Sequence, residues 1–316
     1  MRVDSALKNF LLAKRADGLS GKTVIWYERM LNPFALKFQG EVIENITANQ
    51  MRHYVVSLRE RESRYGSEQS IRPRITGGLS YESVSSHIRA LKTFWNWSTK
   101  EYHLQHNPMA NVRRQPRHSA NPKAISLDDL KALLAATGKD MAGIRDRAIL
   151  LFLLDTGCRV QGLLGLKTDD LELDAYCAYV VEKGSKRRVV YFTTYTAELL
   201  RIWIHRRPQS SSAVFCSLSN RHYGQAMTYD GFKQLMNALK KRAGVKGRVN
   251  PHSFRHAYAR EYLRNGGDLS TLSRLMGHSD SLVTSWYYGV FTAAELAEMH
   301  RKHSPVNELF KQAQHS

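Results

Sequence analysis

The chain has 316 residues, of which 42% are apolar and 24% are charged, and this composition excludes a disordered or fibrous protein. The formal net charge is +19 and the isoelectric point about 9.9, so a polyanion such as nucleic acid is a better partner than a neutral metabolite. The sequence has neither the roughly 20 apolar residues of a membrane helix nor a secretory signal, which predicts a cytoplasmic protein with no membrane partner.

The first hundred residues have a helical pattern. Thr47 and Gln50 form a capping-box pattern that predicts a helix start. An apolar stripe at helical spacing consists of Val84, Ile88, Leu91 and Trp95. We expect Trp95 and Trp97 to belong to the core rather than to stack on bases. These patterns predict four helices, at 3–16, 21–38, 47–63 and 80–103, and an exposed basic loop over 64–79.

A polar, basic segment with Pro116 and Pro122 divides the chain. We predict a first domain over 1–106, a linker over 107–123 and a second domain over 124–316. The net charge is +8 for residues 1–116 and +11 for residues 117–316, so both halves are expected to face the same polyanion and to enclose it.

The second half changes pattern along its length. Ser126 and Asp129 predict a helix start, with the helix reaching about residue 136, and an apolar helix runs from Ile144 to a stop at Gly157. Segments 177–181 and 187–192 flank a glycine-containing turn and predict a β-hairpin. Further helices are expected at 195–207, 228–243, 251–265, 268–276, 280–289 and 293–302. The domain is therefore predicted to be mainly α with one small sheet.

Three cysteines are too widely spaced for metal or redox pairs and are expected to be core thiols: Cys158, Cys177 and Cys216. The histidines lack zinc-site spacing, so no metal site is predicted.

Several polar residues stand next to helix ends. Pro251 starts a helix on which His252 and Arg255, three residues apart, project from one face and would attract an oxyanion. Arg159 comes shortly after the helix-ending Gly157, and His278 follows another helix-ending glycine. Each signal alone has an ordinary explanation, because exposed arginines and buried tyrosines are common.

In order along the chain, these residues resemble the tyrosine recombinase (phage integrase) family. The segment from His252 to Tyr287 carries the most specific match, with a His-x-x-Arg box, a Gly-His box and a tyrosine nine residues after His278. The resemblance covers nearly the whole chain, including the first arginine box at Arg159 and the lysine-bearing hairpin at Lys183.

The resemblance implies roles for six residues: Arg159, Lys183, His252, Arg255, His278 and Tyr287. Tyr287 would attack a scissile phosphate and form a 3′-phosphotyrosyl intermediate, the arginines would hold the non-bridging oxygens, and Lys183 would protonate the leaving 5′ oxygen. His252 and His278 would bind the phosphate or manage the tyrosine proton. Physical chemistry agrees, because two fork-shaped guanidinium groups match the charge and shape of a phosphodiester in displacement. The reaction would need no ATP, metal or other cofactor.

The implied fold is a helical core-binding domain followed by a mostly α catalytic domain with a small antiparallel sheet. The implied partners are double-stranded DNA with inverted-repeat core sites and three further copies of the chain in a synaptic tetramer. We expect an integrase or transposase of a mobile element, in the cytoplasm and on the nucleoid when bound to DNA. The chain begins almost directly in the first core-binding helix, so no separate arm-binding domain is expected. Resolution of chromosome or plasmid dimers is the second hypothesis, followed by a type IB topoisomerase-like enzyme or a non-catalytic relative.

Some positions depart from the family pattern or leave alternatives open. The family commonly has an acidic residue three positions after the first arginine, where this chain has Gly162, so the carboxylate that holds Arg159 is expected from Asp169 or Asp170. Lys186 is a weaker candidate than Lys183, and Tyr288 would lie roughly 100° around a helix from Tyr287. Arg187 and Arg188 are expected to be DNA-backbone contacts or solvated cations. The C-terminal segment 291–310 would dock on a neighbouring copy or on its own domain.

Overall fold

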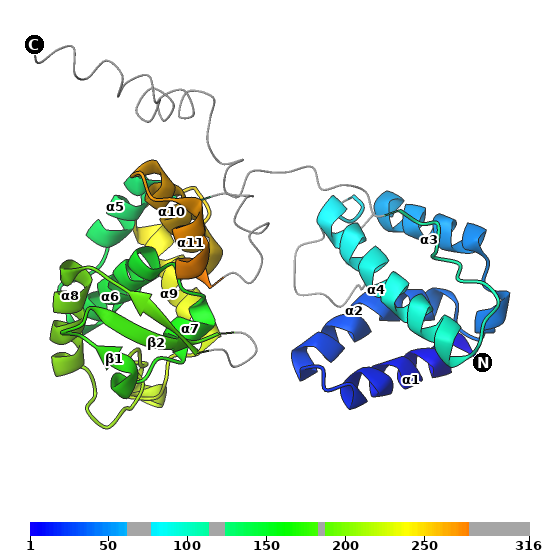
Figure 1. Ribbon diagram of the computed structural model, residues 1–316, viewed down its shortest axis with the longest axis horizontal. Helices are drawn as coiled ribbons and strands as arrows, with labels where there is room; N and C mark the ends of the chain where they lie inside the picture. The colour runs from blue at the N-terminus through cyan, green and yellow to red at the C-terminus, as the bar shows by residue number, and fades with distance from the viewer. Residues whose placement is uncertain (62–76, 114–123, 183–186, 278–316) are drawn as a thin grey trace, which may run out of the picture. The chain divides into compact units, whose positions relative to one another are not determined.

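The computed structural model describes residues 1–61, 77–113, 124–182 and 187–277 (Figure 1). The chain divides into two compact units, Met1–Ser119 and Ala120–Ser316, and each has its own hydrophobic core. This division falls within the range 107–123 that the sequence analysis gives as a linker. Over the described ranges, no helix combines the length and the apolar character needed to cross a bilayer.

The first unit is helical, as predicted. Its α-helices in the described ranges are α1 (Val3–Ala16), α2 (Gly21–Lys37), α3 (Ala48–Glu60) and α4 (Tyr81–Glu101). The predicted capping box at α3 is confirmed. The main-chain amide of Gln50 donates to the Thr47 hydroxyl at 3.2 Å, and the main-chain amide of Thr47 donates to Gln50 Oε1 at 2.7 Å. Most of the expected loop over 64–79 lies outside the described residues.

Helix α4 carries the centre of this unit's core. Trp95 is fully buried, with its ring edge-on to Phe34 at 6.1 Å between ring centroids, so its predicted core role is confirmed. Trp97 is half-buried and packs edge-on against Phe10 at 5.5 Å. Helices α1, α2 and α3 all pack on α4, which therefore organises the unit.

A buried histidine links α4 to α2. Nδ1 of His87 lies 2.8 Å from the main-chain oxygen of Met30, and since a carbonyl only accepts, Nδ1 carries the proton. Burial lowers the pKa of His87 below its usual 6.5; the hydrogen bond to Met30 opposes that shift and Arg61 adds to it. His87 is therefore neutral in the folded protein at pH values where an unfolded chain would begin to protonate it.

The second unit surrounds one apolar helix. Its helices in the described ranges are α5 (Leu127–Ala135), α6 (Met141–Thr156), α7 (Val160–Leu164), α8 (Thr194–Arg206), α9 (Tyr229–Arg242), α10 (Pro251–Arg264) and α11 (Leu269–Met276). Helix α6 is buried over most of its circumference and packs against α8 and α10. It starts three residues before the predicted Ile144 because Asp140 caps it, accepting from the Gly143 amide at 2.9 Å. Helix α7 was not predicted, since five residues are too few for a periodic pattern.

The predicted hairpin belongs to a three-stranded antiparallel sheet in the order β1 (Leu171–Glu172), β2 (Cys177–Val181) and β3 (Arg187–Tyr191). The two-residue β1 was not predicted. Val180 pairs with Arg188, so both side chains lie on one face, and the alternation of a strand puts Glu182 on that face too. The three cysteines are buried and unpaired in disulfides, as expected for core thiols.

The neutral state of His87 predicts a pH effect on stability. As the pH falls through 6.5, the unfolded chain takes up a proton at His87 and the folded chain does not, so the free energy of unfolding falls. The slope from this residue is at most about 1.4 kcal/mol per pH unit. Denaturant unfolding between pH 7.5 and 5 should therefore show a shallower pH dependence in His87→Gln, which can still donate to Met30. Equal slopes in the two proteins would contradict this account.

Candidate active site

Arg159 stands directly after a tightly constrained helix end. Helix α6 ends at Gly157, whose φ of +56° is a left-handed conformation that favours glycine. A Cβ atom at this position would lie 2.4 Å from Cδ1 of Tyr258, so the ring of Tyr258 also excludes any side chain here. Cys158 is buried, and Arg159 is the N-cap of α7. The sequence prediction that Arg159 comes shortly after a helix-ending glycine is confirmed.

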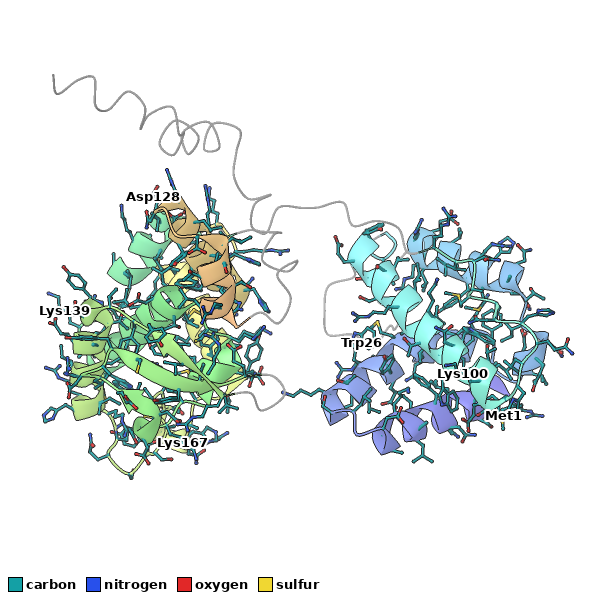
Figure 2. The ribbon with its side chains drawn as sticks, viewed as in Figure 1. Met1, Trp26, Lys100, Asp128, Lys139 and Lys167 are labelled. Atoms are coloured by element: carbon teal, nitrogen blue, oxygen red, sulfur yellow. The ribbon has the colours of Figure 1, made fainter. Side chains whose placement is uncertain are left out.

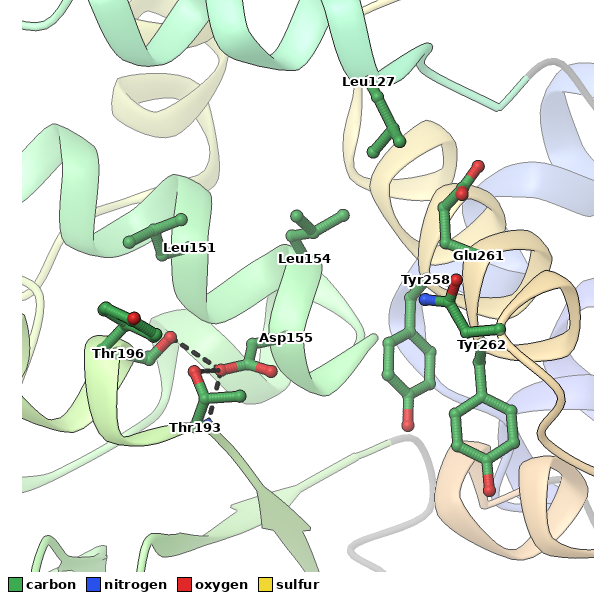
Figure 3. Close-up of a pocket in the computed structure, with 11 residues that line it drawn as sticks. Leu127, Leu151, Leu154, Asp155, Thr193, Thr196, Tyr258, Glu261 and Tyr262 are labelled. Carbon is green, nitrogen blue, oxygen red and sulfur yellow. Dashed lines mark hydrogen bonds between the residues drawn. The ribbon is translucent and has the colours of Figure 1, made fainter.

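The same end of α6 is fastened to α8 through Asp155 (Figure 3). One carboxylate oxygen of Asp155 accepts from the amide of Thr193 at 2.7 Å, from its hydroxyl at 2.8 Å and from the hydroxyl of Thr196 at 2.7 Å. A groove of about 650 Å³ lies here, lined by Asp155 and also by Tyr258 and Tyr262 of α10. These bonds fix the point from which the chain turns toward Arg159.

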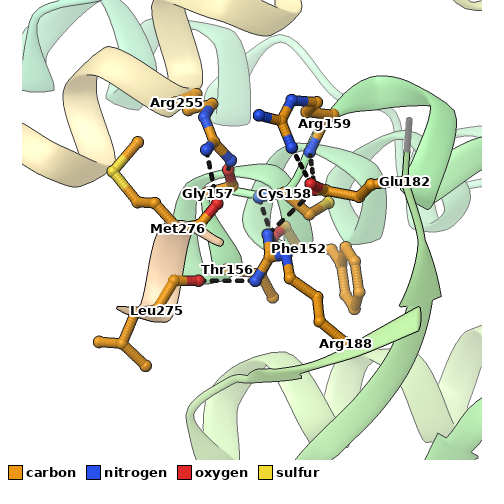
Figure 4. A network of polar contacts seen from close by, with 10 residues as sticks. All are labelled: Phe152, Thr156, Gly157, Cys158, Arg159, Glu182, Arg188, Arg255, Leu275 and Met276. Atoms are coloured by element: carbon orange, nitrogen blue, oxygen red, sulfur yellow. Dashed lines mark hydrogen bonds and ion pairs between the residues drawn. The ribbon is translucent and has the colours of Figure 1, made fainter. Parts of the chain in front are cut away.

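A buried carboxylate, that of Glu182, holds Arg159 (Figure 4). Nη1 of Arg159 donates to Oε2 of Glu182, and the Arg159 amide donates to Oε1 at 3.1 Å. Nη2 of Arg188 donates to the same Oε1 at 3.0 Å. The Glu182 side chain is 5% exposed and that of Arg159 is 37% exposed. The carboxylate therefore lies beneath a guanidinium that still faces solvent.

The charge state of Glu182 follows from these contacts. Burial acts to raise its pKa, but the hydrogen bonds from Arg188 and the Arg159 amide, with the charges of both guanidinium groups, outweigh burial and hold the pKa below its usual 4.5. Glu182 is therefore ionised at neutral pH. Its negative charge offsets the repulsion between the two arginines that meet there.

Arg255 is held by two helix ends. Its helix, α10, has Pro251 in its first turn, as the sequence indicated, and it starts with a capping box between Asn250 and Ser253. Nη1 of Arg255 donates to the main-chain oxygen of Gly157 at 2.6 Å, and Nη2 donates to that of Met276 at 2.6 Å. These bonds bring Arg255 to the segment that carries Arg159 and to the end of α11.

Arg188 connects the sheet to α11, which corrects its expected role. Its Nη1 donates to the main-chain oxygen of Leu275 at 2.6 Å, and its side chain is only 16% exposed. The prediction of a solvated cation is wrong for Arg188, because its guanidinium joins Glu182 to the last turn of α11. Its neighbour Arg187 is 59% exposed and pairs with Asp170 at 3.3 Å.

The six predicted site residues have different outcomes. Arg159 and Arg255 lie in one network, as described above. His252 is exposed on the first turn of α10, three residues before Arg255 and therefore on the same side of that helix. Three residues lie outside the described part of the chain: Lys183, His278 and Tyr287. One described range ends at residue 182, directly before Lys183, and another ends at residue 277, directly before His278.

Glu182 was not among the predicted site residues, and the expectation that Asp169 or Asp170 holds Arg159 is wrong for the described contacts. Asp170 accepts from the Lys167 amide at 3.1 Å and pairs with Arg187, while Asp169 lies 3.4 Å from the Thr168 hydroxyl. The strand alternation could have identified Glu182, because it extends the buried face of β2 by one step beyond Val180.

Comparisons with known proteins agree with this arrangement. The model of the phage integrase family matches residues 123–293. Tyrosine recombinase XerD of Listeria monocytogenes serotype 4b is 29% identical over 305 residues, which cover 94% of this chain and 96% of the relative. Among solved structures, the XerA recombinase has a TM-score of 0.51 at 26% identity and covers 96% of this chain and 99% of its own. The Tn1549 transposon integrase in complex with a circular intermediate DNA has a TM-score of 0.72 at 16% identity, covering 94% and 98%, and indicates the fold alone.

The end of α11 yields a prediction about Arg188. Gly277 has a φ of +64°, and a Cβ atom there would lie 2.8 Å from Cδ of Arg188. Gly244 has the same φ of +64° with nothing within 4 Å of such an atom, so it is a matched control. Gly244→Ala should lower the free energy of unfolding by about 1–2 kcal/mol, which is the cost of placing alanine in a left-handed conformation. Gly277→Ala should cost about 1–3 kcal/mol more in urea unfolding, because Arg188 must move.

Placing both substitutions in an Arg188→Ala background isolates the contact. The excess cost at Gly277 should then disappear, since the side chain that the new methyl group displaces is gone. Equal losses for the two alanine variants in the wild-type background would show that Arg188 does not restrict this turn.

Proposed function

Since this chain belongs to the phage integrase family as a site-specific tyrosine recombinase, we propose that it cleaves and rejoins duplex DNA through a 3′-phosphotyrosyl intermediate on Tyr287. One observation carries the proposal: Arg255 donates to the main-chain oxygen of Gly157, two residues before the partly exposed Arg159. Two guanidinium groups from distant parts of the sequence are thus fixed near one another, as a phosphodiester in displacement requires.

The arginines stabilise charge in this mechanism. As the phosphorus is attacked, negative charge gathers on its non-bridging oxygens, and Arg159 and Arg255 hold those oxygens with charge-assisted hydrogen bonds. Glu182 and the carbonyls of Gly157 and Met276 fix the two guanidinium groups before DNA binds, so little reorganisation is needed during the reaction.

The remaining steps move protons and exchange one ester for another. The oxygen of Tyr287 bonds to phosphorus, the bond to the 5′ oxygen breaks, and Lys183 protonates that leaving oxygen. His252 and His278 bind the phosphate or accept the tyrosine proton, since a phenol with a pKa near 10 needs help at neutral pH. Phosphodiesters are formed and broken in equal number, so the reaction needs no ATP. Guanidinium groups supply the charge stabilisation, so it needs no metal ion.

The partner in this proposal is double-stranded DNA with inverted-repeat core sites. The net charge of +19 is shared by both halves of the chain, which supports a clamp of the core-binding domain 1–106 and the catalytic domain 124–316, joined by the linker 107–123. Four copies form the synaptic complex, with each copy cleaving one strand. The protein then works in the cytoplasm, on the nucleoid.

The biological role has two candidates. Integration or transposition of a mobile element is the first. Resolution of chromosome or plasmid dimers is the second, favoured by the match to XerD over nearly the full length of both chains. Mapping the covalent cleavage site separates them: a site at the ends of an element supports the first, and a single chromosomal or plasmid site supports the second.

The proposal predicts a covalent adduct that depends on Tyr287. Nicked duplexes covering the DNA that flanks the gene should trap a protein–DNA adduct that survives detergent, and its yield should not change with EDTA. Tyr287→Phe should abolish the adduct because the attacking oxygen is removed, and the neighbouring Tyr288→Phe is the control that retains it.

The opposite pattern, with the adduct lost in Tyr288→Phe and kept in Tyr287→Phe, would show that Tyr288 is the nucleophile and would contradict the assignment to Tyr287. No adduct with any duplex would favour a non-catalytic DNA-binding relative. If a single copy of the protein relaxed, with multiple turnovers, a supercoiled plasmid that lacks a specific site, a topoisomerase-like enzyme would be favoured.

DNA binding should also respond steeply to salt. Each phosphate that the protein neutralises contributes about −0.9 to the slope of log K against log salt concentration. A random-sequence duplex should be titrated at salt concentrations from roughly 50 to 200 mM, the range over which phosphate contacts lose much of their affinity. The slope of log K against log salt concentration should be several units below zero. A flat response would contradict the clamp.

A further inference from the structure

Gly162 occupies the position at which the family commonly carries an acid that supports the first arginine. Gly162 belongs to α7, three residues after Arg159, and its amide donates to the Arg159 carbonyl at 2.9 Å. A glycine has no carboxylate to offer to the guanidinium. The site must therefore hold Arg159 in another way or leave it unsupported.

The carboxylate of Glu182 reaches Arg159 from the end of β2 instead of from α7. Glu182 follows β2, more than twenty residues along the chain from Arg159, and its two oxygens accept from Arg159 Nη1, the Arg159 amide and Arg188 Nη2. The side chain is 5% exposed, so these charged contacts are shielded from water and salt. A carboxylate bonded in this way orients the guanidinium and leaves its exposed part for a ligand.

Gly162 and Glu182 share one small space. A Cβ atom built on Gly162 would lie 3.7 Å from Cγ of Glu182 and 3.2 Å from Cβ of Val180. A side chain at position 162 would therefore start where the Glu182 side chain passes on its way to Arg159. Position 162 and position 182 are therefore alternative starting points for a carboxylate beside Arg159, and glycine at 162 leaves this space to the Glu182 side chain.

We propose that Glu182 is the positioning residue that orients Arg159 for the scissile phosphate, and that Gly162 leaves room for it: the supporting acid is the residue after β2 instead of a residue of α7. This inference rests on the proposed role of Arg159 in phosphate binding. Glu182 itself does not touch the DNA or the reacting atoms. The carboxylate also fastens Arg188, so the same residue couples the first arginine to the last turn of α11.

Exchanging the two residues tests the proposal. Glu182→Gln and Glu182→Gly should each slow adduct formation in single turnovers on the nicked duplex by about 10- to 100-fold, because Arg159 loses its orientation. DNA affinity should change by less than about threefold, since one of many phosphate contacts is altered. Gly162→Glu alone should also slow the reaction, because two carboxylates then compete for one guanidinium.

The double variant, Gly162→Glu with Glu182→Gly, should react within about fivefold of the wild-type rate, faster than either single variant. Asp170→Asn is the matched control, because it removes the same charge from a nearby carboxylate that pairs with Arg187. Its rate should equal that of the wild type. A wild-type rate in Glu182→Gln, or a double variant no faster than Glu182→Gly, would overturn the proposal.

A second readout separates this inference from the proposed function. The side-chain Nε–H resonance of Arg159, assigned by its loss in Arg159→Lys, should report an ordered side chain in the wild-type protein. In Glu182→Gln it should sharpen toward the resonance of a freely rotating side chain. In the double variant it should return to its wild-type form. Absence of any adduct from the wild type would refute the proposed function, while unchanged Arg159 dynamics in Glu182→Gln would refute the role of Glu182 by itself.

Discussion

The arginine network of the second unit depends on the buried negative charge of Glu182. Arginines repel one another, yet Arg159 and Arg188 meet at a single point because the Glu182 carboxylate accepts hydrogen bonds from both and from a backbone amide. Removing one partner from such a buried ion pair lowers the stability of a protein far more than removing one partner from an exposed pair. The hairpin, the turn before α7 and the last turn of α11 are thereby held in register.

Helix C-termini supply the rest of the negative potential. Gly157 is the C-cap of α6, and Leu275 and Met276 close α11, so their carbonyls lie at the negative ends of two helix dipoles. Arg255 and Arg188 donate to these carbonyls at 2.6 Å. Cations are therefore concentrated at one place without a cluster of acids, and the exposed side of Arg159 keeps its positive charge for an anion.

The sequence predicted what depends on local pattern. Capping residues such as Thr47 and Ser126, apolar stripes and helix-ending glycines located most helices to within a few residues. The order of the motifs from Arg159 to Tyr287 indicated the family. It did not predict α7 and β1, which are too short to show periodicity. Glu182 was missed because its partner is distant in sequence, and the supporting acid was sought among the aspartates near Arg159. Arg188 was misjudged because burial at a strand end depends on the helix that covers it.

The central claim is that Arg159 and Arg255 act on one phosphate. The most direct test is a crystal structure of Tyr287→Phe bound to a duplex that contains the mapped cleavage site. The account predicts that guanidinium nitrogens of both arginines lie within about 3 Å of non-bridging oxygens of the same scissile phosphate, with Glu182 still bonded to Arg159. A scissile phosphate held by other residues, with Arg159 turned away from it, would contradict the account.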